Sequence, residues 1–214
     1  MAANPGFQLS LDVKGRTCLV LGGEDEAAEK AQRLLDAGAR VIVISPTLNE
    51  TLRTLASSAK VLYRGRLFRA TDTEGVLLLV NTLRGDPDFS RSLYDLAKKE
   101  RFLLCSTDQP DVSTVMMPAL VSRGYLRLAI STSGVAPALG SRLREQLGDL
   151  FTDEFRMFLV WLAAIRDETQ QAEPDAERRR ARLREAVEGF RLTGHIEYPK
   201  NWLDERSRSA GEKT

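Results

Sequence analysis

The chain has 214 residues, of which 43% are hydrophobic and 29% are charged, values typical of a globular protein with a sizeable core. The formal net charge is +1, so nothing indicates a bulk attraction to nucleic acid. No apolar run approaches the roughly 20 residues that span a bilayer. The N-terminal stretch MAANPGFQLSLDVKG lacks the features of a secretory signal, and we expect a cytoplasmic protein.

Short apolar runs alternate with helical patterns in the first half of the chain. Such runs, bounded by glycine or proline, are typical of strands buried on both faces. The expected strands are TCLVLGG (17–23), RVIVISP (40–46), GVLLLVN (75–81) and RFLLCST (101–107), with a weaker one at KVLYRG (60–65). The expected helices are 26–38, 47–59 and 88–100. This alternation predicts parallel strands, so residues 1–112 should form a Rossmann-like, doubly wound α/β domain.

The pattern changes after this domain. Residues 111–124 are expected to form a short helix that Pro118 breaks or kinks, and 125–132 an alternating strand. Residues 133–148 are expected to form a loop that leads into a helix. From 149 to 214 the pattern is helical, with apolar stripes in 151–171 and 172–190 and a polar tail from Lys200.

The two cysteines, Cys18 and Cys105, both lie in apolar runs. We expect buried, reduced thiols rather than a disulfide or a metal pair. One histidine, His195, is too few for a histidine-rich metal site, so we assign no metal ligands.

The loop after the first strand fits the dinucleotide-binding pattern Gly-x-Gly-x-x-Ala at Gly22 and Ala27, but Glu24 replaces the second glycine. That glycine lets the backbone approach a pyrophosphate, whereas Glu24 adds bulk and negative charge. The second strand ends in Ser45 and Pro46, without the acidic residue that would hold a ribose hydroxyl. The pattern indicates the fold more strongly than the cofactor, and a Rossmann-like domain without a nucleotide is an open alternative.

Three segments together are similar to a known family. They are GRTCLVLGGEDEAAEKAQRLLDAGARVIVISP (15–46), CSTDQPDVSTVMMPALVSRG (105–124) and LRLAISTSGVAPALGSRLREQLG (126–148). They resemble the siroheme synthase N-terminal family of precorrin-2 dehydrogenases, some of which are also sirohydrochlorin ferrochelatases. The third segment is the most specific, since strand, serine-rich turn, proline and arginine-bearing helix agree in order and spacing. Glu24 and Glu26 replace a glycine and an apolar residue of the family's loop.

The resemblance implies an NAD-dependent dehydrogenase with a dimerisation region, here 113–148, and a C-terminal helical domain, here 149–214. It carries the family's functional aspartate onto Asp108, where a carboxylate could accept a proton from the tetrapyrrole. A cap or turn role is the alternative for Asp108. The residues assigned to NAD are Gly22, Gly23, Glu24, Asp25, Glu26, Ser45, Pro46 and Thr82.

The tetrapyrrole substrate that the resemblance implies, precorrin-2 or sirohydrochlorin, carries many carboxylates. Its site therefore needs cations and hydrogen-bond donors, and arginine suits carboxylates best. The residues assigned to it are Ser131, Thr132, Ser133, Gly134, Arg142 and Arg144. For the arginines the alternative is a solvated helix face, and for the other residues it is a turn chosen for its backbone geometry.

We also expect a homodimer through residues 113–148 and the following helices. The strand at 125–132 lies outside the first sheet, and the apolar stripe on 151–165 is wide for a single-domain surface. The leading hypothesis is an NAD-dependent precorrin-2 dehydrogenase. Because some members of the family also insert metal into the product, metal insertion is a second activity to consider. The alternatives are an NAD-deficient chelatase or tetrapyrrole-binding protein, and a non-enzymatic Rossmann-like dimer.

Overall fold

The computed structural model describes residues 6–107 and 109–199. Its contacts divide the chain into two compact units. The first contains the residues up to Ser122 together with Arg127–Leu150, and the second contains Arg123–Leu126 together with the residues from Phe151 onward. The division into three parts at residues 112 and 148 stays a prediction.

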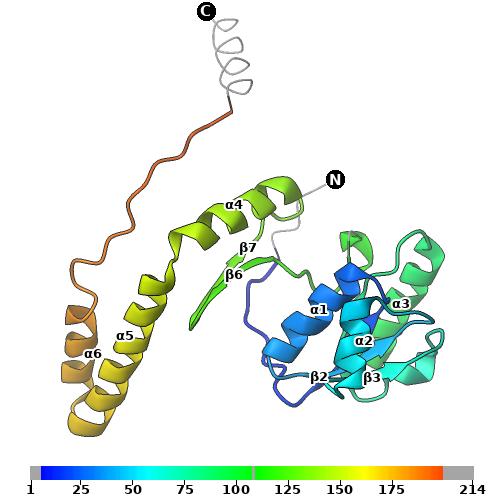
Figure 1. Cartoon of the computed structure of the whole chain (residues 1–214), viewed down its shortest axis with the longest axis horizontal. Helices are drawn as coiled ribbons and strands as arrows, with labels where there is room; N and C mark the ends of the chain where they lie inside the picture. The colour runs from blue at the N-terminus through cyan, green and yellow to red at the C-terminus, as the bar shows by residue number, and fades with distance from the viewer. Residues whose placement is uncertain (1–5, 108, 200–214) are drawn as a thin grey trace, which may run out of the picture. The chain divides into compact units, whose positions relative to one another are not determined.

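A parallel sheet forms the centre of the first unit (Figure 1). Its strands, within the described residues, are β1 (Thr17–Leu21), β2 (Arg40–Ile44), β3 (Val61–Arg64), β4 (Val76–Asn81) and β5 (Leu103–Ser106), in the order β3-β2-β1-β4-β5. All neighbouring strands in this sheet are parallel. The helices α1 (Asp25–Asp36) and α2 (Glu50–Ser57) pack on one face, and α3 (Pro87–Glu100) packs on the other. The predicted Rossmann-like, doubly wound fold is confirmed.

The alternation of side chains along β1 builds a core on each face of the sheet. Val20 packs in the cluster that contains Ala31 of α1, whereas Leu19 packs in the cluster that contains Leu93 of α3. Each fully buried side chain of this size contributes about 1.5–3 kcal/mol. The carboxyl ends of the strands are therefore held on a rigid support.

Both cysteines are buried and free, which confirms the prediction of reduced thiols. Burial among apolar side chains raises the pKa of the Cys18 thiol and the pKa of the Cys105 thiol above their ordinary values. Both side chains belong to the core on the α1 and α2 face.

The helix predicted for residues 111–124 is wrong. After a short 3-10 turn at Pro110–Val112 the chain is extended, and it forms the strand β6 (Ala119–Arg123). The backbone N–H of Thr114 donates to Leu104 O at 2.8 Å, and the Thr114 hydroxyl accepts from Leu104 N at 2.7 Å. These contacts with β5, together with a proline that cannot donate to a helix, outweigh the helical spacing of the apolar residues.

The strand predicted at 125–132 is confirmed as β7 (Leu126–Ile130), which pairs with β6. Gly124 has a φ of +55° in the turn between them, a conformation that favours glycine. The chain then passes through a serine-rich turn into α4 (Pro137–Leu150).

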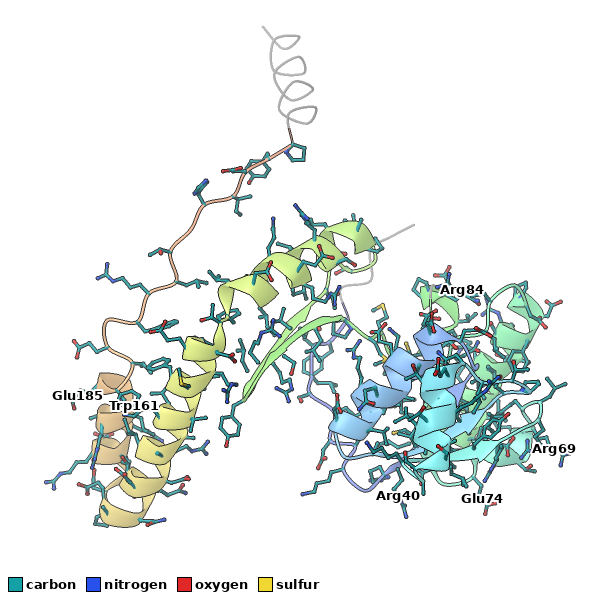
Figure 2. All side chains as sticks on the ribbon, viewed as in Figure 1. Arg40, Arg69, Glu74, Arg84, Trp161 and Glu185 are labelled. Atoms are coloured by element: carbon teal, nitrogen blue, oxygen red, sulfur yellow. The ribbon has the colours of Figure 1, made fainter. Side chains whose placement is uncertain are left out.

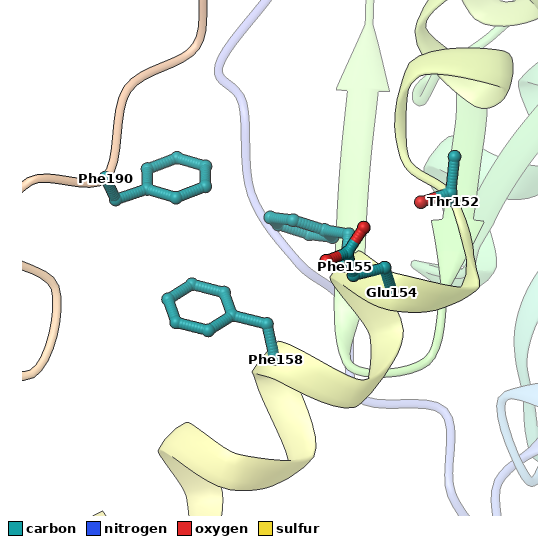
Figure 3. A pocket seen from close by; sticks show the side chains of 5 residues that line it. All are labelled: Thr152, Glu154, Phe155, Phe158 and Phe190. Carbon is teal, nitrogen blue, oxygen red and sulfur yellow. The ribbon is translucent and has the colours of Figure 1, made fainter.

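The second unit contains the helices α5 (Asp153–Ala172) and α6 (Ala176–Glu185). Aromatic side chains gather at the start of α5, and Phe158 stacks on Phe190 with ring centroids 5.7 Å apart. With Thr152, Glu154 and Phe155 they line a cavity of about 310 Å³ (Figure 3). The second predicted helix is shorter than expected, because α6 ends at Glu185 and Phe190 follows it. Within the described part of the chain, no helix is both long and apolar enough to cross a membrane.

Candidate functional site

The loops that follow β1, β2, β4 and β5 meet at one edge of the sheet. Gly22 N donates to Ile44 O at 3.1 Å, Thr82 N to Leu21 O at 3.0 Å, and Thr107 N to Asn81 O at 2.9 Å. Figure 2 shows Arg84 at this edge, whereas Arg40 and Glu74 lie at the opposite edge. The order of strands reverses between β1 and β4, the position at which open α/β sheets bind ligands.

The glycines of the first loop are required by close packing between loops. Gly22 has a φ of +123°, and a Cβ atom there would collide with the hydroxyl of Thr82. A Cβ atom on Gly23 would collide with the carbonyl oxygen of Thr47 and lie 2.8 Å from Ser45 Oγ. The structure therefore brings together the predicted residues Gly22, Gly23, Ser45 and Thr82.

The N-terminus of α1 is not capped by a side chain. Its N-cap residue, Glu24, is exposed and has extended backbone angles, and its carboxylate makes no capping hydrogen bond. In contrast, Asn49 caps α2 by accepting from Leu52 N at 2.9 Å, and Asp86 caps α3 by accepting from Phe89 N at 2.8 Å. The peptide N–H groups of the first turn of α1 are therefore disposed to bind an anion, which fits the pyrophosphate of a dinucleotide.

Two of the three acidic side chains in this loop have partners on neighbouring loops. Asp25 Oδ1 accepts from Asn49 Nδ2 at 2.7 Å, and Glu26 Oε2 lies 3.0 Å from Arg84 Nη2. The backbone N–H of Asn49 also donates to Gly23 O at 2.7 Å. The N-termini of α1 and α2 are thus joined at the same edge of the sheet.

Pro46, the remaining residue assigned to NAD, lies in the loop after β2. The hydroxyl of Tyr63 donates to Ser45 O at 3.0 Å and approaches Pro46 O at 3.4 Å. This contact fixes the loop against β3. Pro46 therefore lies at the same edge of the sheet as the other residues predicted to bind NAD.

Asp108, the predicted catalytic residue, lies outside the described residues. The positions on both sides of it are tied to Ser113, whose Oγ accepts from Ser106 N at 2.9 Å and donates to Gln109 O at the same distance. Ser106 Oγ is buried and has no hydrogen-bond partner within residues 6–107 and 109–199. The segment that carries Asp108 therefore begins at the carboxyl end of β5, beside the β4 loop.

The residues assigned to the tetrapyrrole lie on the turn between β7 and α4 and on α4 itself. The turn uses its own hydroxyls, since Ser131 Oγ accepts from Ser133 N at 3.2 Å and Thr132 Oγ1 accepts from Ala136 N at 3.3 Å. Ser133 and Gly134 have φ values of +54° and +79°. These bonds favour a turn role for the hydroxyls.

The predicted arginines of α4 are exposed and lie near one acidic side chain. Arg142 approaches Glu145 at 3.7 Å and Arg144 approaches it at 3.9 Å, both long distances for an ion pair. Among the described residues, no hydrogen bond or ion pair joins the set assigned to the tetrapyrrole to the set assigned to NAD. In the same residues, no group of three or more His, Cys, Asp or Glu side chains could hold a metal ion.

Sequence reasoning missed Asn49 and Arg84 as members of the site. Asn49 had a detectable signal, because an asparagine directly before a helical pattern is a common N-cap. Arg84 had none, since its partner Glu26 lies 58 positions away in the sequence.

The comparisons with known proteins agree with this geometry. A family described as "Putative NAD(P)-binding" matches residues 9–119. Siroheme synthase from Xylella fastidiosa (strain M12) is 32% identical over 180 residues, which cover 84% of this chain and 38% of that protein. Siroheme synthase from Neisseria meningitidis serogroup C is 35% identical over 141 residues, which cover 66% of this chain and 29% of that protein. The chain thus spans well under half the length of these curated relatives.

A solved structure, "SirC, precorrin-2 dehydrogenase", has a TM-score of 0.73 and 24% sequence identity to this chain. The match covers 86% of this chain and 90% of that one. At this level of identity the likeness supports the fold.

Proposed function

The chain belongs to the siroheme synthase N-terminal family of NAD(P)-binding proteins, and from this premise we propose that it oxidises precorrin-2 to sirohydrochlorin with NAD. Family membership supports a nicotinamide dinucleotide as the cofactor. The observation that carries the proposal is the uncapped N-terminus of α1, which lies at the switch point of a parallel sheet beside two tightly packed glycines.

The proposed reaction removes two hydrogens from the tetrapyrrole, one as a hydride and one as a proton. A bound nicotinamide would supply the hydride acceptor. The N–H groups in the first turn of α1 would hold the pyrophosphate, and the packing of Gly22 against Thr82 keeps the loops after β1 and β4 together. The Asp108 carboxylate accepts the proton, and Ser113 orients the segment on either side of it.

The proposed substrate contacts come from the turn before α4 and from α4. Arg142 and Arg144 are exposed and, within the described residues, their ion-pair contacts are the long ones with Glu145, so both could reach substrate carboxylates at little cost. Peptide N–H groups of the turn at 131–134 supply further donors. The proposed assembly is a homodimer.

A second candidate is an NAD-deficient family member that acts as a sirohydrochlorin chelatase or a tetrapyrrole-binding protein. The observation in its favour is Glu24, which places a carboxylate at the N-terminus of the helix that would receive the pyrophosphate. In that function Asp108 would accept a proton from a pyrrole nitrogen while the metal ion, as substrate, enters the ring.

Incubation of the protein with precorrin-2 and NAD tests the proposal directly. We expect the visible spectrum of sirohydrochlorin to develop together with the near-ultraviolet absorbance of NADH. Asp108→Asn should abolish both signals while the circular dichroism spectrum is unchanged, whereas Asp111→Asn, which alters an exposed carboxylate in the next turn, should be active. Full activity of Asp108→Asn would assign Asp108 to the turn. Tetrapyrrole binding or metallation without reduction of NAD would favour the second candidate.

A further inference from the structure

A cation from the loop between β4 and α3 reaches the helix that would receive the cofactor. Arg84 Nη2 lies 3.0 Å from Glu26 Oε2, which belongs to the first turn of α1. The Arg84 side chain is 67% exposed and the Glu26 side chain is 27% exposed. Gly85, directly after Arg84, has a φ of +86°, and Asp86 is then the N-cap residue of α3. The guanidinium is therefore held on a short loop beside the anion-binding end of α1.

The first turn of α1 carries negative charge where the pyrophosphate would approach. Glu24, Asp25 and Glu26 place three carboxylates at the end of α1 that carries its favourable N–H groups. Asp25 is bonded to an amide, which carries no net charge. The pairing of Glu26 with Arg84 supplies positive charge to the position that a doubly charged pyrophosphate would approach.

We propose that Arg84 is a cofactor-binding residue that exchanges Glu26 for the pyrophosphate of the dinucleotide. This inference rests on the proposed dinucleotide site. An exposed ion pair contributes little to stability, so Arg84 can leave Glu26 at small cost. A guanidinium can bind phosphate through two parallel hydrogen bonds, a geometry that suits the pyrophosphate. Glu26 therefore competes with the cofactor for Arg84.

The alternative is a purely structural role, in which the ion pair holds the loop after β4 against the first turn of α1. The two functions predict opposite signs for one variant. If Glu26 competes with the cofactor, its neutralisation strengthens binding. If the ion pair is only structural, neutralisation of Glu26 loosens the loop after β4 and weakens cofactor binding.

The experiment measures dissociation constants for NADH, ADP-ribose and adenosine by fluorescence and calorimetry. ADP-ribose retains the pyrophosphate and adenosine lacks it, so their difference isolates the phosphate contact. The variants are Arg84→Ala, Arg84→Lys, Glu26→Gln and the double variant, with Arg40→Ala as a matched control. Arg40 is an exposed arginine at the opposite edge of the sheet (Figure 2). Thermal unfolding of each variant verifies that it folds.

We expect Arg84→Ala to weaken NADH and ADP-ribose by about tenfold, as for one lost charge-assisted hydrogen bond, and to leave adenosine unchanged. Arg84→Lys should retain part of the affinity, since lysine keeps the positive charge but lacks the two parallel N–H donors of a guanidinium. Glu26→Gln should tighten both dinucleotide ligands by about threefold, and this gain should shrink in high salt and in the Arg84→Ala background.

Three outcomes would overturn the inference and leave the proposed function standing. They are an unchanged affinity in Arg84→Ala, a weaker affinity in Glu26→Gln, and an equal loss for adenosine and ADP-ribose. If the wild-type protein binds neither NADH nor ADP-ribose, the inference and the proposed dinucleotide site are both wrong.

Discussion

Glu24 stands where a dinucleotide-binding loop commonly has its second glycine, yet its backbone does not need one. Its φ of −93° and ψ of −175° are extended values that any residue adopts without strain. The side chain is exposed. In this loop the positions that do require glycine are Gly22 and Gly23, where Thr82 and Thr47 exclude a Cβ atom. We therefore expect Glu24 to affect NAD binding mainly through its charge.

We predict that Glu24→Gly and Glu24→Gln both increase the affinity for NAD by about fivefold, the effect of removing one charge repulsion at a helix N-terminus. The gain should fall as ionic strength rises, because the charge is exposed and screened. Titration of both variants with NAD at low and high salt measures this, with Glu50→Gln in the first turn of α2 as the control. A gain in the glycine variant alone would assign the effect to bulk, and no gain in either would contradict the prediction.

Asp72 is a buried carboxylate at the edge of the first unit, 5% exposed. Arg66 donates to its two oxygens at 2.6 and 2.8 Å, Arg64 donates to Oδ1, and the backbone N–H of Arg69 donates at 2.8 Å. These bonds, those from Arg66 first, hold the pKa of Asp72 well below its usual range, although burial alone would raise it. The ionised carboxylate therefore ties the end of β3 to the turn that precedes β4.

We predict that Asp72→Asn lowers the free energy of unfolding by about 2 kcal/mol at neutral pH, since both arginines lose their acceptor. The folded-state pKa is lower than that of the unfolded chain, so this stabilisation is present above about pH 4 and is lost as the pH falls further. Urea unfolding across this range should show an acid slope in the wild type that is smaller in Asp72→Asn. Asp88→Asn, an exposed control, should retain the wild-type slope.

At the scale of elements, the strands of the first sheet could be predicted because their residues satisfy local and tertiary demands together. Leu19, Val20 and Leu79 are strand-forming in sequence and completely buried in the structure. The extended conformation of residues 111–124 could not be predicted, because it depends on hydrogen bonds with Leu104 that no local pattern reveals. For the same reason the glycines of the site could be predicted from the loop pattern, whereas Arg84 could not.

Asn49 links two elements at the site, since it caps α2 and also bonds to Asp25 of α1. We predict that Asn49→Ala destabilises the protein by about 1–2 kcal/mol, the usual effect of a lost N-cap. Asn49→Asp should keep most of the stability, because a carboxylate still caps α2, but it should weaken NAD by placing a further negative charge opposite Asp25. Urea unfolding and NAD titration of the two variants separate these effects. Equal stability of Asn49→Ala and the wild type would contradict the capping role.

At the scale of the whole molecule, exposed apolar side chains are frequent in the second unit. On α5, Met157, Val160 and Trp161 are each at least half exposed. After α6, Leu192 and Ile196 are 60% and 77% exposed. Apolar surface of this extent, on α5 and on the segment after α6, is typical of an interface between protein chains.

We predict that the protein is a two-fold symmetric homodimer that uses this surface. Sedimentation velocity at micromolar concentration should give twice the chain mass of 23.8 kDa. Trp161→Glu should shift the protein toward the monomer, because an interface cannot bury an unpaired carboxylate without a large loss of free energy. Leu62→Glu places the same charge on an exposed leucine of the edge strand β3 in the first unit, so it should remain dimeric. A wild-type monomer, or dissociation by both variants alike, would contradict the prediction that α5 forms the interface.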